Sequence, residues 1–459
     1  MTTTVITDYS RALAELRAAL GADVATDPPL LDDMRADRSG HVSPTPPLAL
    51  VSPRSVADVQ SVMRIAAAHG IAVVTRGAGT GLAGGALGSA GEIVLSTLAM
   101  DRVLEINTAD ELAVVEPGIL NAQLNRELLP HGLWFAPDPA SREISTVGGN
   151  IATNAGGLLC AKYGVTRDSV LGLSVVLADG RLVEMGHRSP KGVTGLDLTS
   201  LMVGSEGVLG VIVGATVRTR RLTRGPVFTI GAYFAGVHEA AAACAAVSAA
   251  GIRPSIMELM DVACMTAVGA YLDLPLDSQG GAYVVVQTDG GAAEDEAREL
   301  ELVLAEHGGK VRMAVDADDA ESMLAIRRAM HPALSATGTV LIEDVSVPRS
   351  ALPAMFDAIR AVERRFGIVI PTAAHAGDGN LHPNFVFQGT EVPDQIWEAA
   401  DALFRAALAL GGTLTGEHGI GVLKKRWLRD ELGDDQFELQ RGIKTLFDPH
   451  GLLNPGKVF

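Results

Sequence analysis

The fold is decided by the stretch Arg76-Gly77-Ala78-Gly79-Thr80-Gly81-Leu82-Ala83-Gly84-Gly85. It has five glycines in ten residues and directly follows the apolar run 71–75, which predicts a strand. Glycines let backbone N–H groups turn inward and come close to an anion, and Thr80 can add a hydroxyl. No Gly-Lys-Ser/Thr follows, so this is not a Walker A loop, and the residues after it are not an obvious helix, as a dinucleotide fingerprint requires. The residues alone leave two interpretations open, a pyrophosphate cradle and a tight connection.

The segments around this loop predict alternating strands and a helix. Residues 48–52 form an apolar run typical of a strand, and Ser55 is a plausible N-cap for a helix that extends to His69. Further short strands are expected at 93–95, 103–106 and 112–115.

Small and polar residues recur in the same part of the chain. They form the stretches P-D-P-A-S at 137–141, T-V-G-G-N-I-A-T-N-A-G-G at 146–157, K-Y-G-V at 162–165 and G-S-E-G-V-L-G-V at 204–211. Together with the glycine-rich loop, these motifs suit a long, flat ligand that lies along the backbone.

The order of these motifs, from about residue 46 to 224, resembles the FAD-binding domain of the vanillyl-alcohol-oxidase (PCMH) type. The resemblance implies that the loop 76–81 cradles the FAD pyrophosphate, and that 137–157 and 206–212 line the rest of the cofactor. Some relatives bond the flavin covalently through a histidine in the first loop. This loop has none, and His41 and His69 lie outside it, so non-covalent FAD is implied. The implied cofactor-binding residues are Arg76, Gly77, Ala78, Gly79, Thr80, Gly81, Pro137, Asp138, Ser141, Gly148, Gly149, Asn150, Thr153, Asn154, Gly156, Gly157, Tyr163, Glu206, Gly207, Gly210, Val211, Ile212 and Asn454.

A second pattern carries metal chemistry. The stretch H-A-G-D-G-N-L-H-P-N at 375–384 has two histidines on either side of a turn that can bring both imidazoles together. The stretch T-G-E-H-G-I-G follows at 415–421. Two imidazoles and one carboxylate are a common set of ligands for a divalent metal such as Zn²⁺ or Mn²⁺. Asp378 is interpreted as a cap of its own turn.

These two motifs, with F-D-P-H-G-L-L-N-P-G-K near the end, resemble the C-terminal domain of FAD-linked D-2-hydroxyacid dehydrogenases. That family includes D-lactate dehydrogenases, the flavin subunit of glycolate oxidase and D-2-hydroxyglutarate dehydrogenase. The resemblance implies that His375, His382 and Glu417 bind the metal and that His418 is the catalytic base. It also implies substrate contacts from Arg327, Asn384 and His331.

One position departs from part of the family. Relatives that act on 2-hydroxyglutarate place a lysine two residues before the aspartate that matches Asp344, and this chain has Ile342 there. Without that lysine, a second substrate carboxylate has less to bind. We therefore expect a D-lactate-like or larger apolar monocarboxylate, with D-2-hydroxyglutarate or glycolate as the alternative substrates.

The whole chain is expected to be α+β and to divide into three regions. Residues 1–45 form an N-terminal helix and arm, 46–224 a two-lobed FAD-binding domain, and 225–459 an α+β substrate and metal domain with an antiparallel sheet. The last segment is expected to pack back on the FAD domain. In the third region, strands are predicted at 282–288 and 340–347, and helices at 292–306, 349–366 and 395–410.

Composition limits the partners. The net charge is −17 with no long basic cluster, which argues against nucleic acid. The near-apolar stretch 240–250 is too short to span a bilayer. The cysteines Cys160, Cys244 and Cys264 show neither a disulfide framework nor an iron–sulfur pattern, and each is expected to be buried. A cytoplasmic location is expected, with peripheral membrane contact left open, and a homodimer is the default assembly. The electron acceptor stays open between a quinone, a cytochrome, an electron-transfer flavoprotein and oxygen.

The sequence leaves three other functions open. A flavin-dependent transferase of the alkyl-glycerone-phosphate-synthase type would share the two-domain plan, but it gives no role to Glu417. A zinc hydrolase would use the same ligands but leaves 76–157 unexplained. The chain could also be a flavin subunit that works only within a larger complex.

Overall fold

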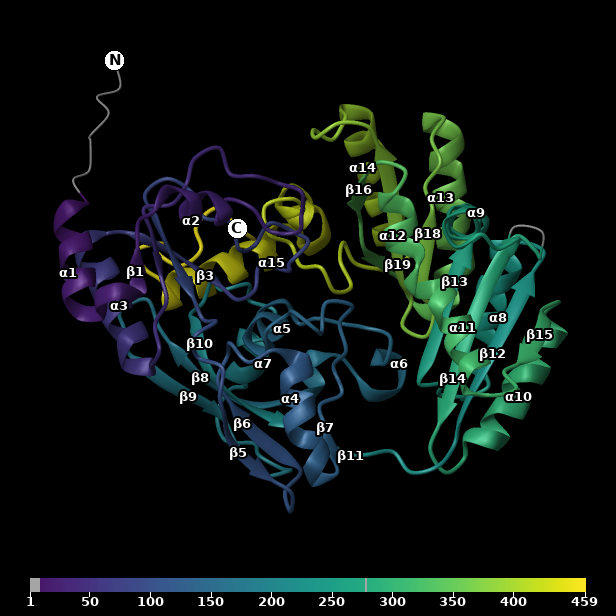
Figure 1. The fold of residues 1–459 in the computed structure, drawn as a ribbon. Coiled ribbons are helices and arrows are strands. Elements are labelled where there is room, and N and C mark those ends of the chain that lie inside the picture. Colours follow the sequence, from purple (N-terminus) through teal and green to yellow (C-terminus); the bar gives the residue numbers. More distant parts are fainter. Residues whose placement is uncertain (1–8, 277–278) are drawn as a thin grey trace. The chain divides into compact units, whose positions relative to one another are not determined.

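The computed structural model describes residues 9–276 and 279–459, so residues 1–8 of the predicted N-terminal region lie outside it. The chain divides into two compact units. Unit 1 comprises Met1–Ala155, Val165–Leu222 and His418–Phe459, and unit 2 comprises Gly156–Gly164 and Thr223–Glu417. The C-terminal helix α15, yellow in Figure 1, therefore belongs to the same unit as the purple N-terminal helices.

The first lobe of unit 1 is built on the sheet β1-β2-β4-β3, in which β2, β4 and β3 run parallel. Its elements are α1 (Ser10–Leu20), β1 (Val24–Ala25), α2 (Pro28–Asp33), β2 (Ala49–Val51), α3 (Val56–His69), β3 (Ala72–Arg76) and β4 (Glu92–Ser96). The predicted start of α3 is confirmed, because the Ser55 side chain accepts a hydrogen bond from the N–H of Asp58. The left-handed Gly70 then ends the helix.

The second lobe of unit 1 is built on the antiparallel sheet β5-β6-β10-β8-β9. Its elements are β5 (Val103–Asn107), β6 (Leu112–Val115), α4 (Asn121–Leu128), β7 (Leu133–Trp134), α5 (Val147–Thr153), β8 (Val170–Val176), β9 (Leu182–Gly186), α7 (Leu198–Met202), β10 (Val211–Arg218), β11 (Arg220–Arg221) and α15 (Lys425–Phe447). Val176 and Val211 from this sheet pack in one core with α1 and α3, so the two lobes share apolar packing.

Unit 2 is built on the antiparallel sheet β15-β12-β14-β13-β18-β19-β16, with β17 paired to β19. The side chains of Ile256, Met260 and Ala373 lie in one core with residues of the helices α9, α11 and α12. The elements are α6 (Cys160–Tyr163), β12 (Val227–Phe234), α8 (Val237–Ala249), β13 (Ile256–Asp261), α9 (Val262–Leu272), β14 (Ala282–Asp289), α10 (Ala293–Glu306), β15 (Lys310–Met313), α11 (Ala317–Arg328), α12 (Met330–Ser335), β16 (Thr339–Ile342), β17 (Val345–Ser346), α13 (Leu352–Phe366), β18 (Thr372–His375), β19 (Asn380–Phe387) and α14 (Asp394–Ala409).

Two predicted elements were wrong in detail. The strand expected over 340–347 is split into β16 and β17 by Glu343 and Asp344, which leave the ladder. The helix expected from 349 begins as α13 only at Leu352, after a short 3₁₀ turn and next to Pro353, which suits a first helical turn.

The burial of the cysteines agrees with the expectation from composition. Cys160, Cys244 and Cys264 are buried, and none of them forms a disulfide within the described part of the chain. Among the helices of residues 9–276 and 279–459, none combines the length and the apolar character needed to cross a membrane.

Candidate active site

The site in unit 2 is built on the hairpin of β18 and β19. His375 ends β18, and the N–H groups of Asp378 and Gly379 both donate to its carbonyl oxygen, which closes the turn. Gly379 has φ +80° and a Cβ there would collide with the carbonyl oxygen of Val347, so only glycine fits. In the ladder Ala373 is the partner of His382, which puts both histidines on the same face of the sheet.

The hairpin brings the two predicted imidazoles together with Glu417. The ring centroids of His375 and His382 lie 5.0 Å apart in a T-shaped arrangement. Glu417 Oε1 lies 3.5 Å from His375 Nε2 and 3.2 Å from His382 Nε2. One ligand atom from each of the three residues lies within 4.8 Å of the others, so this set could hold a divalent cation.

Behind His375 lies a carboxylate that the sequence did not single out. Glu258 stands opposite His375 in the ladder between β13 and β18, and its side chain is 1% exposed. Its Oε1 accepts a hydrogen bond from His375 Nδ1 at 2.7 Å, and its Oε2 accepts one from Arg327 Nε at 2.8 Å. The predicted substrate-binding arginine is therefore held beside a predicted metal ligand, whereas neighbouring Arg328 pairs with Glu321 at the surface.

The electrostatics of this cluster favour a bound cation. Burial disfavours a charged imidazole, but Glu258 and Glu417 outweigh it and raise the pKa of His375 well above its usual range. Burial also disfavours a charged carboxyl at Glu417, but the two imidazoles outweigh it and hold the pKa of Glu417 well below its usual range. Burial raises the pKa of nearby Asp378 to about 6.

Glu417 is held in place by a second buried carboxylate and by a glycine. Asp344, which is fully buried, accepts hydrogen bonds from Thr415 Oγ1 at 2.5 Å and from the N–H of Glu417 at 3.0 Å. Gly156 lies so close to Glu417 that a Cβ would collide with its carboxylate. Gly156 thus packs against Glu417, and its predicted contact with the cofactor stays a prediction.

The other predicted substrate-binding residues differ in their surroundings. Asn384 is 1% exposed, its Nδ2 donates to the carbonyl oxygens of Pro371 and His382, and its Oδ1 has no hydrogen-bond partner among the described residues. Ile342 stands opposite Asn384 in the ladder of β16 and β19. His331 is exposed on α12, where its Nδ1 bonds to Ser335 Oγ.

In unit 1, the glycine-rich loop follows β3 and lies against the N-terminus of α5. A Cβ on Gly77 would collide with Thr146 Oγ1, the side chain that caps α5. A Cβ on Gly81, by contrast, would find only Asp37 Oδ2 at 4.0 Å, so packing against the protein does not require a glycine there. The Arg76 guanidinium folds over Gly79 and donates to the carbonyl oxygen of Ala86.

Buried polar atoms gather in the segments assigned to FAD and directly beside them. Thr75 Oγ1, Ser145 Oγ and Asn150 Nδ2 have no hydrogen-bond partner within the described part of the chain. Buried donors and acceptors of this kind are normally satisfied, so their place beside the glycine-rich loop and α5 fits a polar cofactor. The residues present therefore fit FAD.

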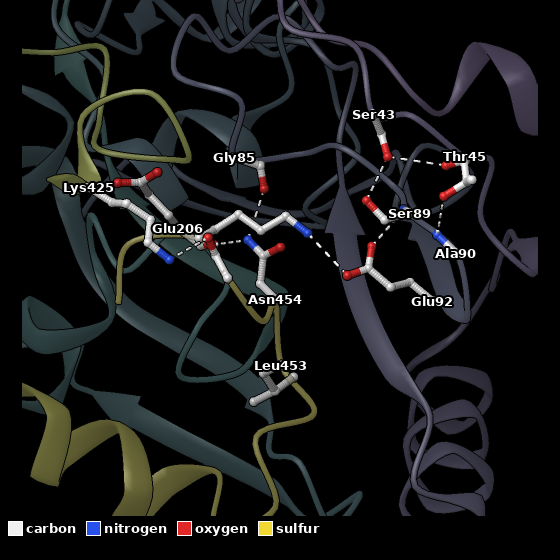
Figure 2. A network of polar contacts seen from close by, with 12 residues as sticks. Ser43, Thr45, Gly85, Ser89, Ala90, Glu92, Glu206, Lys425, Leu453 and Asn454 are labelled. Carbon is white, nitrogen blue, oxygen red and sulfur yellow. Dashed lines mark hydrogen bonds and ion pairs between the residues drawn. The ribbon is translucent and has the colours of Figure 1, made fainter. Parts of the chain in front are cut away.

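Two further predicted cofactor residues, Glu206 and Asn454, bind the chain itself. The carboxylate of Glu206 accepts the N–H groups of Ile420 and Gly421, at 2.7 Å and 2.8 Å. Burial raises the pKa of Glu206 to about 7. Asn454 Nδ2 donates to the carbonyl oxygens of Gly85 and Glu206, and Figure 2 shows its side chain between these two residues.

Several other predicted cofactor residues also have partners within the chain. Tyr163 donates its hydroxyl to Asp289, and Asn154 Oδ1 accepts the N–H of Arg167. Val211 and Ile212 are in β10 with their side chains in the two cores of unit 1, so any contact they make with FAD would fall to their main chain. Their cofactor roles stay predictions.

Glu258 and Asp344 are the residues that sequence reasoning missed. Glu258 lies within the apolar stretch I-M-E-L-M-D, where a charged residue interrupts a buried strand. That interruption was the available signal, because a carboxylate is rarely fully buried without a partner. The partner lies 117 positions away, so its identity requires the sheet register.

Two families match the chain. Residues 47–186 match the family described as an FAD binding domain, and residues 227–458 match the C-terminal domain of FAD linked oxidases. The glycolate oxidase subunit GlcD of Bacillus subtilis is 36% identical, over 90% of this chain and 89% of the relative. The D-lactate dehydrogenase of Archaeoglobus fulgidus is 35% identical, over 90% and 94%. The D-2-hydroxyglutarate dehydrogenase of Stutzerimonas stutzeri is 31% identical, over 95% and 96%.

Solved structures confirm the predicted fold class. A p-cresol methylhydroxylase with substrate bound matches with a TM-score of 0.79 at 16% identity, over 98% of this chain and 96% of that one. A 4-ethylphenol oxidase from Gulosibacter chungangensis matches with a TM-score of 0.77 at 18% identity, over 98% and 97%. At this identity the likeness concerns the fold alone, which is that of the vanillyl-alcohol-oxidase type. By the family matches and the close relatives together, the chain belongs to the FAD-linked oxidases and is an FAD-dependent oxidoreductase.

Proposed function

We propose that this protein oxidises a D-2-hydroxy acid to the 2-oxo acid with FAD and a divalent metal, and that its substrate is a D-lactate-like or larger apolar monocarboxylate. One observation carries the proposal: His375, His382 and Glu417 converge beside Arg327 on one buried face of the unit 2 sheet. The relatives named as glycolate oxidase subunit, D-lactate dehydrogenase and D-2-hydroxyglutarate dehydrogenase support the substrate class.

Arg327 is proposed to bind the substrate carboxylate. Its Nε–H donates to Glu258, so its terminal nitrogens carry the donors for a second, substrate carboxylate. Asn384 is proposed to face the substrate hydroxyl, because its buried Oδ1 is an acceptor without a partner among the described residues. Arg327 and Asn384 would together position the carboxylate and the hydroxyl of the 2-hydroxy acid.

His375, His382 and Glu417 are proposed to hold the metal through Nε2, Nε2 and Oε1, and His418 to act as the base. His418 follows Glu417 directly in the chain, so the base is one peptide bond from a ligand. Histidine is the side chain that most often serves as a general base, which suits removal of the hydroxyl proton. When bound, the metal would supply stabilisation of negative charge on the substrate oxygen and FAD would supply the acceptor for the hydride of C2, so that the products would be the 2-oxo acid, reduced FAD and a proton on His418.

Ile342 is proposed to set the preference for a monocarboxylate. Its partner in the ladder is Asn384, so its side chain lies on the same sheet face as that predicted substrate contact. An apolar side chain there offers no donor to a second carboxylate, which would lose its hydration without compensation.

Removal of the metal tests the proposal. Treatment of the FAD-loaded protein with a chelator should abolish turnover with an artificial electron acceptor while the flavin absorbance stays with the protein. Addition of Zn²⁺ or Mn²⁺ should restore turnover, which also serves as the control for damage by the chelator. Full turnover in a sample shown to be metal-free by elemental analysis would contradict the metal part of the proposal.

A further inference from the structure

We propose that Glu258 is a positioning residue that couples the metal ligand His375 to the substrate-binding Arg327. The proposal rests on the function proposed above and adds a residue that the sequence motifs do not include. It depends on one geometric fact, namely that the two oxygens of a single buried carboxylate accept from these two side chains, at 2.7 Å and 2.8 Å.

The first part of the role concerns His375. A neutral imidazole carries one proton, and the nitrogen opposite to it is free to bind a metal. Because Glu258 accepts from Nδ1, the proton stays on Nδ1, and Nε2 is left for the cation that it would share with His382 and Glu417. A carboxylate in this position fixes both the tautomer and the ring orientation of a histidine ligand.

The second part concerns Arg327, on α11. Its side chain is 12% exposed, and its Nε–H donates a hydrogen bond to Glu258. This hydrogen bond leaves the two terminal nitrogens of the guanidinium to donate to a substrate carboxylate. Any movement of the carboxylate would displace both partners together, so metal affinity and substrate affinity should change together.

Another carboxylate on the same strand provides a matched control. Asp261, the last residue of β13, is also buried, but its partners are the main-chain N–H groups of Cys264 and Thr372 and the side chain of Cys264. Asp261→Asn therefore removes a buried charge from β13 without touching the predicted ligands or Arg327. A purely structural effect of losing a buried carboxylate would appear equally in both variants.

The test compares Glu258→Gln and Asp261→Asn in the full-length, FAD-loaded protein. Zn²⁺ affinity is measured by competition with a chromogenic chelator, and KM and kcat are measured with D-lactate. Glutamine keeps the volume, but its amide offers one acceptor and one N–H₂ group, so one of the two donors loses its partner. We expect Glu258→Gln to weaken Zn²⁺ binding roughly 10- to 100-fold and to raise KM, while Asp261→Asn leaves both near the wild-type values.

Two results would overturn the inference. Zn²⁺ affinity and KM at wild-type values in Glu258→Gln would do so, and so would equal losses in both variants. If the wild-type protein itself binds no Zn²⁺ or Mn²⁺, the proposed function fails and the inference fails with it. If the wild type binds the metal and Glu258→Gln binds it equally well, only the inference fails.

A second variant covers the case in which Glu258→Gln does not fold. Glu258→Asp keeps the negative charge for Arg327 but is one methylene shorter, so its carboxylate does not span both partners. We expect it to weaken Zn²⁺ binding and raise KM in the same direction. Wild-type values for both quantities in Glu258→Asp would overturn the inference equally.

Discussion

Three buried carboxylates of unit 2 differ in what they hold. Glu258 holds the side chains of His375 and Arg327, and Asp344 holds the backbone of Glu417. Asp261 caps the N-terminus of α9 through the N–H of Cys264. Of the three, Glu258 and Asp344 bind residues with a predicted role in the site, and Asp261 does not. Burial of a carboxylate alone therefore does not identify a functional residue in this protein.

The role of His418 leads to a prediction about turnover. If this imidazole removes the hydroxyl proton, His418→Ala should lower kcat by roughly 10² or more, because a positioned general base contributes about that factor. The flavin spectrum should stay that of the wild-type protein, since the imidazole is not needed to hold FAD. Steady-state kinetics with D-lactate and an artificial acceptor check this, and near-normal turnover would remove His418 from the role.

The apolar side chain at Ile342 leads to a prediction about specificity. Ile342→Lys should raise kcat/KM for D-2-hydroxyglutarate relative to D-lactate by about tenfold, the order of one hydrogen bond to a charged group. Ile342→Leu is the control, because it changes shape without adding a donor. The ratio is obtained from kinetics on both substrates, and a ratio that does not change in the lysine variant would reject this assignment.

The predicted metal ligands could be inferred from the sequence, whereas the contact between Glu258 and Arg327 could not. His375 and His382 lie on either side of a short turn, and local chain geometry alone can bring them together. Glu258 and Arg327 meet across 69 positions, and that contact depends on how α11 packs on the sheet. Nothing in the local pattern around Arg327 predicts its partner.

At the scale of elements, the C-terminal segment after α15 ties separate parts of unit 1 together. The N–H of Val73 in β3 donates to the carbonyl oxygen of Leu452, and the N–H of Asn454 donates back to Val73. Lys457 pairs with the buried Glu92 of β4, whose other oxygen accepts the N–H of Ser89. Figure 2 shows Glu92, Ser89 and Asn454 in one polar network around the end of the chain.

Asn454 tests whether this segment supports the cofactor. Asn454→Ala removes two buried hydrogen bonds and places alanine at φ +44°, so we expect a loss of about 2–3 kcal/mol in unfolding free energy. FAD should also dissociate more readily, because the loop at Gly85 and the turn at Glu206 lose their link.

Urea unfolding and FAD titration of the apoprotein measure the two effects. Asn107→Ala is the control, since Asn107 bonds only to its own turn in the contacts described, at Ala109 and Asp110. FAD affinity at the wild-type level in Asn454→Ala would show that the segment stabilises the fold without supporting the cofactor.

Element boundaries were predictable where local signals were strong. Helix α3 begins after the Ser55 cap and ends at His69, as expected. The prediction of one continuous strand over 340–347 was wrong, because the buried polar residues Glu343 and Asp344 interrupt it. The interruption depends on tertiary contacts, which the local sequence does not show. Asp344 binds Thr415 and the N–H of Glu417, more than seventy positions away.

At the scale of the whole molecule, each unit is assembled from segments that are distant in the chain. Gly156–Gly164 belongs to unit 2 although its flanking residues belong to unit 1. The contacts of this segment with the rest of unit 2 include the ion pair between the ammonium group of Lys162 and Asp289, at the end of β14. Such long-range pairings leave no periodic pattern in the sequence. The family resemblance therefore indicated the fold, but only the structure shows which segments form each unit.

Anaerobic reduction of the bound flavin tests the proposed oxidation of a D-2-hydroxy acid most directly. D-Lactate, L-lactate, glycolate and D-2-hydroxyglutarate are added separately to the purified yellow protein, and the visible absorbance of the flavin is followed. Oxidation of a D-2-hydroxy monocarboxylate predicts bleaching by D-lactate, weaker bleaching by D-2-hydroxyglutarate, and none by L-lactate. A yellow protein that none of these acids bleaches, or that L-lactate bleaches best, would contradict oxidation of a small D-2-hydroxy acid.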